Sequence, residues 1–242
     1  MDTHGCVRDA PYDYGIDSIA ISCHLWYLIR MEFSELLEII GAEPVFETGM
    51  LLAGDINPAD IRRQLSRWKQ AGKIYQLRRG LYCLAPPFQK GNPHPFLVAN
   101  RMLPASYVSL QSALAYYGMI PEHVPVTTSV TTSRPGYWAT PLGMFDFRHI
   151  QVDLLEGYQW VDLGNKQHAY VASPEKALLD LVYLQPGGDS FDYLIELRLQ
   201  NLDRLDWQFF ERNARWIKKP KLTRAIQAIR KLAGEEEAFE RL

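Results

Sequence analysis

The chain has 242 residues, a formal net charge of −2 at pH 7, 47% hydrophobic residues and 22% charged residues. These values are typical of a globular protein with a buried core, and the length suits two domains. The near balance of charge excludes a uniformly basic protein, so any contact with nucleic acid must be local. The three cysteines are isolated and form no CxxC pair, which favours a reducing cytoplasm over a disulfide framework or a zinc site.

Residues 1–30 contain a semi-apolar run from Ile16 to Ile29, shorter than the roughly 20 apolar residues of a membrane span. A signal peptide needs a basic start and a small-residue cleavage site, and neither is present. We predict that the functional fold begins at Met31. Residues 1–30 are then a poorly ordered extension or the product of a start codon assigned too early, with an extra helix as the alternative.

Residues 31–87 are predicted to form three helices followed by a hairpin. A glycine stops each of the three helices, and a tight turn joins the two strands. This order is that of a winged helix-turn-helix, a DNA-binding domain. The helices are expected at Phe33–Ile40, Pro44–Ala53 and Asn57–Ala71, and the strands at Ile74–Leu77 and Leu81–Leu84.

The third helix is predicted to have one apolar and one basic face. Asn57 is a good N-cap, and Pro58 suits the first helical position. Ile61, Leu65 and Trp68 recur at i, i+4 and i+7, so they are expected to face inward.

The opposite face of this helix is cationic and rich in hydrogen-bond donors, as reading the major groove requires. Asn57–Gly80 holds seven Lys or Arg and one acid. We predict that it binds DNA; the alternative is a solvated amphipathic helix with an ordinary hairpin. The expected base-edge residues are Arg63, Ser66, Arg67 and Gln70; the phosphate contacts are Arg62, Lys69 and Lys73; and Arg78 and Arg79 are assigned to the adjacent backbone or minor groove.

Four prolines between Pro86 and Pro95 predict an extended, non-helical stretch. We place the domain boundary there, with residues 88–103 forming a linker and a short helix.

Residues 104–242 are predicted to form an α+β domain with a mainly antiparallel sheet and C-terminal helices. The β-branched run Thr127–Thr132 and the alternating segment Met144–Ile150 predict strands, and Gly157–Leu163 with His168–Ala172 predicts a hairpin. Helices are expected at Phe96–Met102, Ser109–Gly118, Ser173–Leu184, Phe191–Gln200, Trp207–Trp216 and Lys221–Leu232.

Four blocks of this domain resemble the AbiEi family, the antitoxins and transcriptional regulators of bacterial type IV abortive-infection toxin–antitoxin systems. They are YVSLQSALAYYGMIPE (Tyr107–Glu122), SVTTSR (Ser129–Arg134), TPLGMFDFRHI (Thr140–Ile150) and AYVASPEKALLDLVYL (Ala169–Leu184). The resemblance covers Met31 to Leu184 and keeps the family's order, with a winged helix first. It implies autorepression by the first domain and antitoxin activity in the second.

The resemblance also implies a partner, a nucleotidyltransferase-like toxin encoded alongside. In type IV systems the antitoxin opposes the toxin's effect and needs no stable complex with it. No catalytic motif of the family can be carried over residue by residue.

A second basic cluster follows near the C-terminus. It is interpreted either as a contact surface for DNA, RNA or an acidic partner, or as a solvated face on a helical pair, and the second interpretation is preferred. Its members are Arg215, Lys218, Lys219, Lys221, Arg224, Arg230 and Lys231.

No enzyme motif is present: the chain lacks GxSxG, HExxH, a P-loop and GxGxxG. A nuclease would have to use the loose set Asp146, Asp153, Asp162 and Glu175 with Lys176, and Glu175 is better explained as a helix-start acid. His149 is interpreted as a half-buried strand residue rather than a base.

We therefore predict a cytoplasmic, non-enzymatic regulator that binds double-stranded DNA without a metal or cofactor. Binding as a homodimer on paired half-sites is usual for helix-turn-helix proteins, but no coiled-coil heptad is present to form the dimer. A free-standing transcription factor with a ligand- or protein-sensing second domain is the first alternative, and a metal-dependent nuclease is the second.

Overall fold

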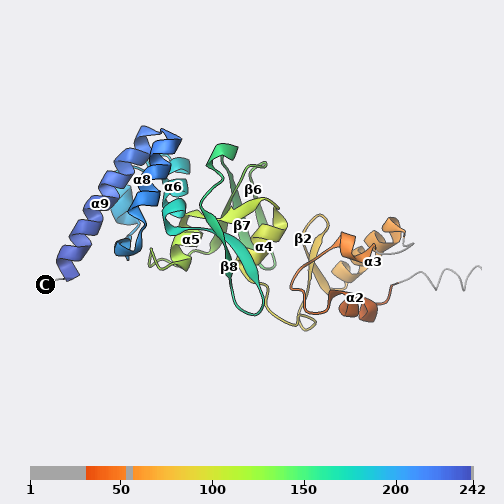
Figure 1. Ribbon diagram of the computed structural model, residues 1–242. Coiled ribbons are helices and arrows are strands. Elements are labelled where there is room, and N and C mark those ends of the chain that lie inside the picture. The colour runs from red at the N-terminus through yellow and green to blue at the C-terminus, as the bar shows by residue number, and fades with distance from the viewer. Residues whose placement is uncertain (1–30, 53–56, 241–242) are drawn as a thin grey trace, which may run out of the picture.

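The computed structural model describes residues 31–52 and 57–240 (Figure 1). The prediction for residues 1–30 and the end of the predicted second helix therefore lie outside the described residues. Within them the protein is α+β, with eight α-helices and two sheets, and no described helix is long and apolar enough to cross a membrane.

The N-terminal part is built on a three-stranded antiparallel sheet of order β1-β3-β2. Its helices cover a compact core of nine buried apolar residues, among them Leu36, Leu65 and Trp68. The elements are α2 (Phe33–Ile40), β1 (Phe46–Glu47), the 3-10 turn η1 (Thr48–Leu51), α3 (Pro58–Gln70), β2 (Ile74–Arg78) and β3 (Leu81–Leu84).

The predicted helix beginning at Pro44 is wrong. The chain forms β1 and η1 instead, because its neighbouring apolar residues are buried on opposite sides. Phe46 lies in the N-terminal core and pairs with Tyr82 of β3, whereas Val45 lies in the core of the larger sheet. Successive side chains point to opposite sides in a strand, not in a helix.

The larger sheet has six strands in the order β6-β7-β5-β4-β9-β8. Within the described residues, three of the five neighbouring pairs are antiparallel, as predicted for a mainly antiparallel sheet, and β5–β7 and β4–β9 are parallel, so the sheet is mixed. The strands are β4 (Ser106–Val108), β5 (Val126–Thr131), β6 (Gly136–Thr140), β7 (Gly143–His149), β8 (Tyr158–Asp162) and β9 (His168–Ala172).

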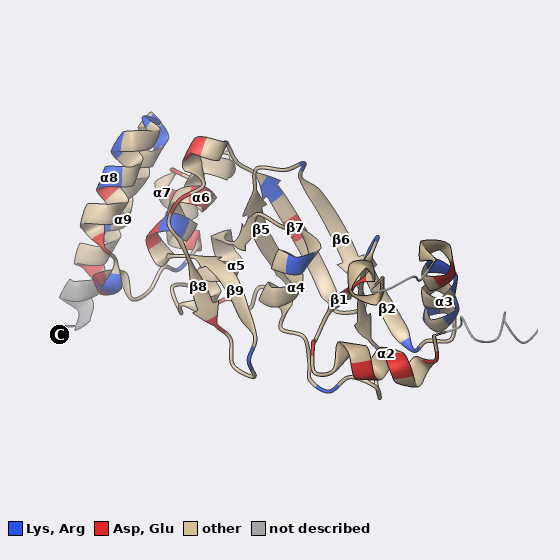
Figure 2. Cartoon of the chain, turned by 45° about the vertical axis from the view of Figure 1, so that its right-hand side comes forward, with Lys and Arg blue, Asp and Glu red and all other residues tan. Residues whose placement is uncertain are grey.

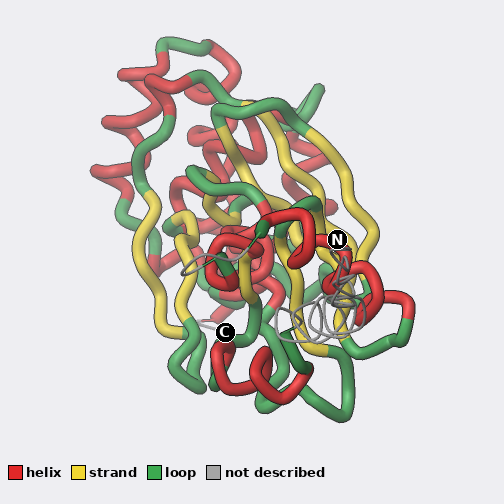
Figure 3. Tube along the Cα trace, turned by 90° about the vertical axis from the view of Figure 1, so that its right-hand side faces the viewer, coloured by secondary structure: helices red, strands yellow, loops and turns green. Residues whose placement is uncertain are grey.

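Helices pack against the central strands of this sheet (Figure 3), and the C-terminal helices extend beyond it at the end away from α3 (Figure 1). α7 stops at Glu196, earlier than predicted, because Arg198 and then Asn201 adopt positive φ angles. The remaining elements are α4 (Pro95–Met102), α5 (Leu110–Tyr116), η2 (Val152–Leu154), α6 (Pro174–Leu184), α7 (Phe191–Glu196), η3 (Leu202–Arg204), α8 (Trp207–Ile217) and α9 (Pro220–Glu240).

The core of the larger sheet extends into the N-terminal part. Leu77, Leu81 and Cys83 of the small sheet, with Val45, belong to the same apolar cluster as residues of α4. Arg101 of α4 also lies 3.8 Å from Glu43. Burial raises the pKa of the Cys83 thiol to about 11. The small sheet therefore packs against two cores. One is the N-terminal core that α2 and α3 cover, and the other is the core of the larger sheet.

A buried polar network ties α6 to the larger sheet. Asp180 is 1% exposed and pairs with Lys176 one helical turn earlier. Its Oδ2 accepts hydrogen bonds from Tyr107 Oη at 2.9 Å and Ser109 Oγ at 2.7 Å. Burial raises the pKa of Asp180, and the pairing with Lys176 opposes that shift. Because each charge of the Lys176–Asp180 pair compensates the other, removing one of them must lower the stability of the fold strongly.

Candidate nucleic-acid interface

α3 forms because both of its ends are satisfied. Asn57 Oδ1 accepts a hydrogen bond from the backbone N–H of Ala59 at 2.9 Å, and Pro58 occupies the first turn. At the other end Gly72 has φ +67°, a conformation that favours glycine, and the Lys73 N–H donates to the Trp68 carbonyl at 2.9 Å.

The inward face of α3 is the predicted one. Ile61, Leu65 and Trp68 are buried, and the Trp68 ring packs edge-on against Phe33 of α2 with centroids 5.5 Å apart. Gln64 is buried as well, which apolar periodicity did not indicate. This packing fixes the rotation of the helix and turns its basic side to solvent.

The outward face of α3 is lined with cations (Figure 2). Arg63 pairs with Asp60 at 3.0 Å, but its side chain is 65% exposed, and an exposed pair of this kind is weak. No acid among the described residues pairs with Arg62 or Arg67. The exposed residues of this face are Arg62, Arg63, Ser66, Arg67, Lys69 and Gln70.

Two of the predicted phosphate contacts make contacts within the protein. Lys69 Nζ donates a hydrogen bond to Gln76 Oε1 of β2 at 2.8 Å. Lys73 Nζ lies over the Phe33 ring, 4.6 Å from its centroid. The positions of both cations are therefore set by these partners.

The hairpin is short and anchored to the N-terminal part. Gly80, at φ +84°, accepts a hydrogen bond from the Thr48 backbone N–H at 2.9 Å. Arg79 is exposed at the turn. Arg78 lies at a register shift and is partly buried, and its Nε is shielded with no hydrogen-bond partner among the described residues. The two arginines are therefore not equivalent.

Most of the second basic cluster is engaged within the C-terminal helices. Arg224 pairs with Asp189 at 2.6 Å and Arg230 with Glu211 at 2.5 Å. Lys221 donates to a backbone carbonyl, and Lys231 lies 3.9 Å from Glu235. The exposed remainder is Arg215, Lys218 and Lys219, which neighbour the exposed Trp216 in the sequence near the junction of α8 and α9.

The residues considered for a nuclease are not brought together. Asp146 is on β7, where it pairs with Arg148 at 3.3 Å, whereas Asp162 is on β8 at the far edge of the sheet. Glu175 is buried, and its Oε1 accepts the Asp206 N–H at 2.8 Å. No group of three His, Cys, Asp or Glu side chains in the described part is placed to hold a metal ion.

His149 is exposed, not half-buried as expected, because β7 ends there and its ring Nδ1 lies 3.1 Å from the Ser133 carbonyl.

Comparison with protein-family models gives no match, and comparison with curated proteins gives no matching sequence.

Proposed function

We propose that the protein is a cytoplasmic DNA-binding regulator of the AbiEi type. Its first domain, residues 31–87, represses its own promoter, and its second domain acts as the antitoxin that opposes a nucleotidyltransferase-like toxin encoded alongside. The observation that carries the DNA-binding part is the exposed face of α3, where Arg62 and Arg67 have no acidic partner among the described residues.

The order of elements supports a winged helix-turn-helix. Helix, short strand, helical turn, helix and hairpin follow one another, and the sheet has the order β1-β3-β2. In a helix-turn-helix the second helix of the motif lies in the major groove, and that position belongs to α3. The hairpin with Arg79 is then the wing.

Each cation has a role in this proposal. Arg63, Arg67, Ser66 and Gln70 present donors to base edges, and an arginine that binds guanine through two hydrogen bonds discriminates strongly. Arg62 and Arg79, with Lys69 and Lys73, neutralise phosphates, which makes the binding salt-dependent. A homodimer on paired half-sites is part of the proposal, because one short helix reads few base pairs.

The antitoxin assignment rests on the resemblance of the four sequence blocks. Contacts between the first and the last of these blocks support the assignment. Tyr107 and Ser109 of the first block donate hydrogen bonds to Asp180 of the last block, which also binds Lys176. These four side chains thus join the first and the last block in one buried network.

A reporter assay tests the autorepressor. The gene's upstream DNA is fused to a reporter, and the full chain is supplied from a second promoter. We expect repression, and we expect Arg62→Ala/Arg67→Ala to relieve it. Lys218→Glu/Lys219→Glu changes the charge more strongly but at the other end of the molecule, so it is the control that should still repress.

Reporter activity that does not change with the wild-type protein would overturn the repressor. The antitoxin is tested separately, by inducing the adjacent gene with and without this one. Growth arrest relieved by the full chain supports the antitoxin, and arrest that persists in its presence contradicts it.

A further inference from the structure

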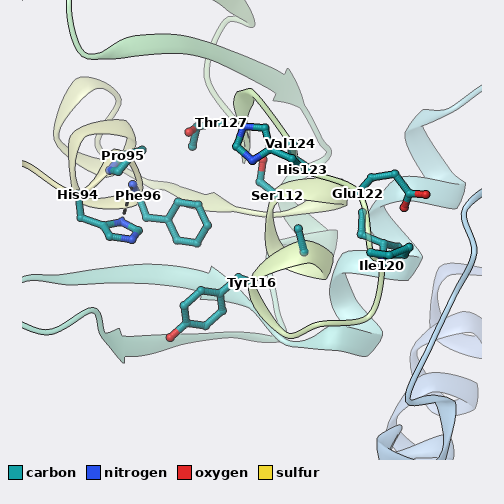
Figure 4. Close-up of a pocket in the computed structure, with 12 residues that line it drawn as sticks. His94, Pro95, Phe96, Ser112, Tyr116, Ile120, Glu122, His123, Val124 and Thr127 are labelled. Atoms are coloured by element: carbon teal, nitrogen blue, oxygen red, sulfur yellow. Dashed lines mark hydrogen bonds between the residues drawn. The ribbon is translucent and has the colours of Figure 1, made fainter.

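A groove of about 440 Å³ opens on the larger sheet between the start of α4, α5 and the chain leading into β5 (Figure 4). This volume lies in the range of small-molecule sites, which is about 300–1,000 Å³. It is lined by His94, Pro95, Phe96, Ser112, Ala115, Tyr116, Ile120, Pro121, Glu122, His123, Val124 and Thr127.

Aromatic rings form part of the wall. Phe96 of α4 and Tyr116 of α5 have centroids 5.6 Å apart and are tilted by 57°. The His94 ring meets Phe96 edge-on at 4.9 Å. Tyr116 is 41% exposed, so its ring is accessible to a ligand. Such rings favour a flat aromatic molecule that can stack on them.

One hydroxyl that lines the groove is available to a ligand. Thr127 is only 9% exposed, and its hydroxyl makes no hydrogen bond to any residue of the described chain. The hydroxyl of the neighbouring Ser112, in contrast, donates to the Val126 carbonyl at 3.0 Å and accepts the Thr128 N–H at 2.8 Å. The Thr127 hydroxyl is not one of the side-chain atoms that are fully shielded from solvent, so it opens into the groove, where a ligand can form a hydrogen bond with it.

The groove offers no positive charge that would attract an anionic ligand, and its one carboxylate is Glu122. None of its lining residues is Lys or Arg, and Glu122 lies 3.5 Å from Arg198. Burial lowers the pKa of His94, and its Nδ1 accepts the Phe96 N–H at 3.1 Å. The imidazole is therefore neutral at pH 7, with its hydrogen on Nε2, where it is a donor.

We propose that this groove binds an uncharged, planar heteroaromatic molecule, which stacks on Phe96 or Tyr116 and hydrogen-bonds to Thr127, and that the ligand regulates DNA binding. The regulatory half rests on the proposed function. Its route is α4: Phe96 lines the groove, and Val98, Ala99 and Met102 of the same helix share a core with Leu77 and Leu81 of the DNA-binding part.

Titration of the full chain with quinoline, followed by NMR, tests the site. We expect saturable shifts at residues 94–96 and 123–127. The matched anion, quinoline-4-carboxylate, should bind at least about tenfold more weakly than quinoline, which corresponds to roughly 1.4 kcal/mol in binding free energy. The non-planar cyclohexanol should not give saturable shifts.

Two variants and one control refine this experiment. Thr127→Val keeps the shape and removes the hydroxyl, so quinoline should bind about 2–10-fold more weakly, as expected for one lost hydrogen bond. Ala115→Phe fills the groove and should abolish binding in a protein whose unfolding is otherwise normal. Thr128→Val makes the same chemical change on the opposite side of β5 and should bind like wild type.

Absence of saturable binding, or equal binding by the carboxylate, overturns the site. DNA affinity is then measured with and without saturating quinoline, and we expect a change of about fivefold or more. Unchanged DNA affinity in the presence of bound quinoline overturns the regulatory half. If the protein does not bind DNA at all, the proposed function fails while the NMR titration still decides the site.

Discussion

Lys69 at the end of α3 donates a hydrogen bond from Nζ to Gln76 Oε1 in the middle of β2, at 2.8 Å. Gln76 Nε2 in turn donates to Tyr82 Oη of β3 at 3.4 Å. The basic helix and both strands of the hairpin are thus linked by side chains as well as by their shared core. In the proposed complex, DNA on the helix would therefore meet a hairpin whose position is already fixed.

Replacing Arg67, on the outward face of α3, should weaken sequence-specific binding. Arg67→Ala is expected to cost about 1–3 kcal/mol on the preferred duplex, if its guanidinium reads a base, and less on a scrambled duplex. Fluorescence anisotropy on both duplexes measures this difference. Arg204→Ala, an exposed arginine of η3, is the control. Equal losses on the two duplexes would remove Arg67 from base reading.

Replacing Arg79, the exposed arginine of the hairpin turn, should weaken all duplexes alike. A lost phosphate contact lowers the slope of log affinity against log salt by about one unit. The measurement is a salt series with Arg79→Ala and wild type. A slope that does not change would show that the turn does not contact phosphate.

Breaking the buried Lys176–Asp180 pair should strongly destabilise the second domain, because Asp180→Asn leaves an uncompensated ammonium in the core. The expected loss in the free energy of unfolding is about 3–5 kcal/mol. Lys176→Met/Asp180→Leu removes both charges and should lose less than the single variant. Urea unfolding followed by circular dichroism checks both, and a double variant less stable than the single one would contradict this account.

Cys83 should resist alkylation while the protein is folded. It is buried between the two cores, and its pKa is raised to about 11, so little reactive thiolate forms at pH 8. Peptide mapping after iodoacetamide treatment, with and without urea, reports this residue separately from the other cysteines. Labelling of the native protein at the denatured rate would show that the small sheet does not pack on the larger core.

The partly buried His94 should make stability depend on pH in a defined direction. Its folded pKa lies below the ordinary value of 6.5, so the unfolded chain binds its proton more readily. Well above pH 6.5 the residue is neutral in both states and contributes no pH dependence. The free energy of unfolding should fall as the pH drops from 6.5 through the folded pKa, and then level off.

His94→Asn keeps a capping side chain at the start of α4 and removes the titration. The difference between this variant and wild type, measured by urea unfolding from pH 8 to pH 5, isolates the contribution of His94. A difference that stays constant across the range would contradict the lowered pKa.

α3 could be predicted from the sequence because its signals are local. Asn57, Pro58 and Gly72 mark its ends, and the apolar residues repeat at helical spacing. β1 could not, because the opposite burial of Val45 and Phe46 depends on a second core that the neighbouring residues do not reveal. The three-residue β4 is likewise too short to carry a pattern, although it is central to the sheet.

The exposed cations of the candidate interface were predictable, whereas their partners were not. Lys69 meets Gln76, and Lys73 meets Phe33, only once the helix packs on its neighbours. One missed feature did have a signal: Lys176 and Asp180 are four residues apart in the helix that begins at Ser173, the spacing of an ion pair on one face. Its burial, however, depends on Tyr107 and Ser109 from a distant strand and loop.

Sequence-specific DNA binding through α3 is tested most directly by a salt-dependent titration. The full chain is titrated onto a duplex from its own upstream region and onto a scrambled duplex of the same composition. We predict tighter binding to the upstream duplex, affinity that falls steeply with salt, and loss of the preference in Arg62→Ala/Arg67→Ala. Equal, weak binding to both duplexes by the wild-type protein would contradict the claim.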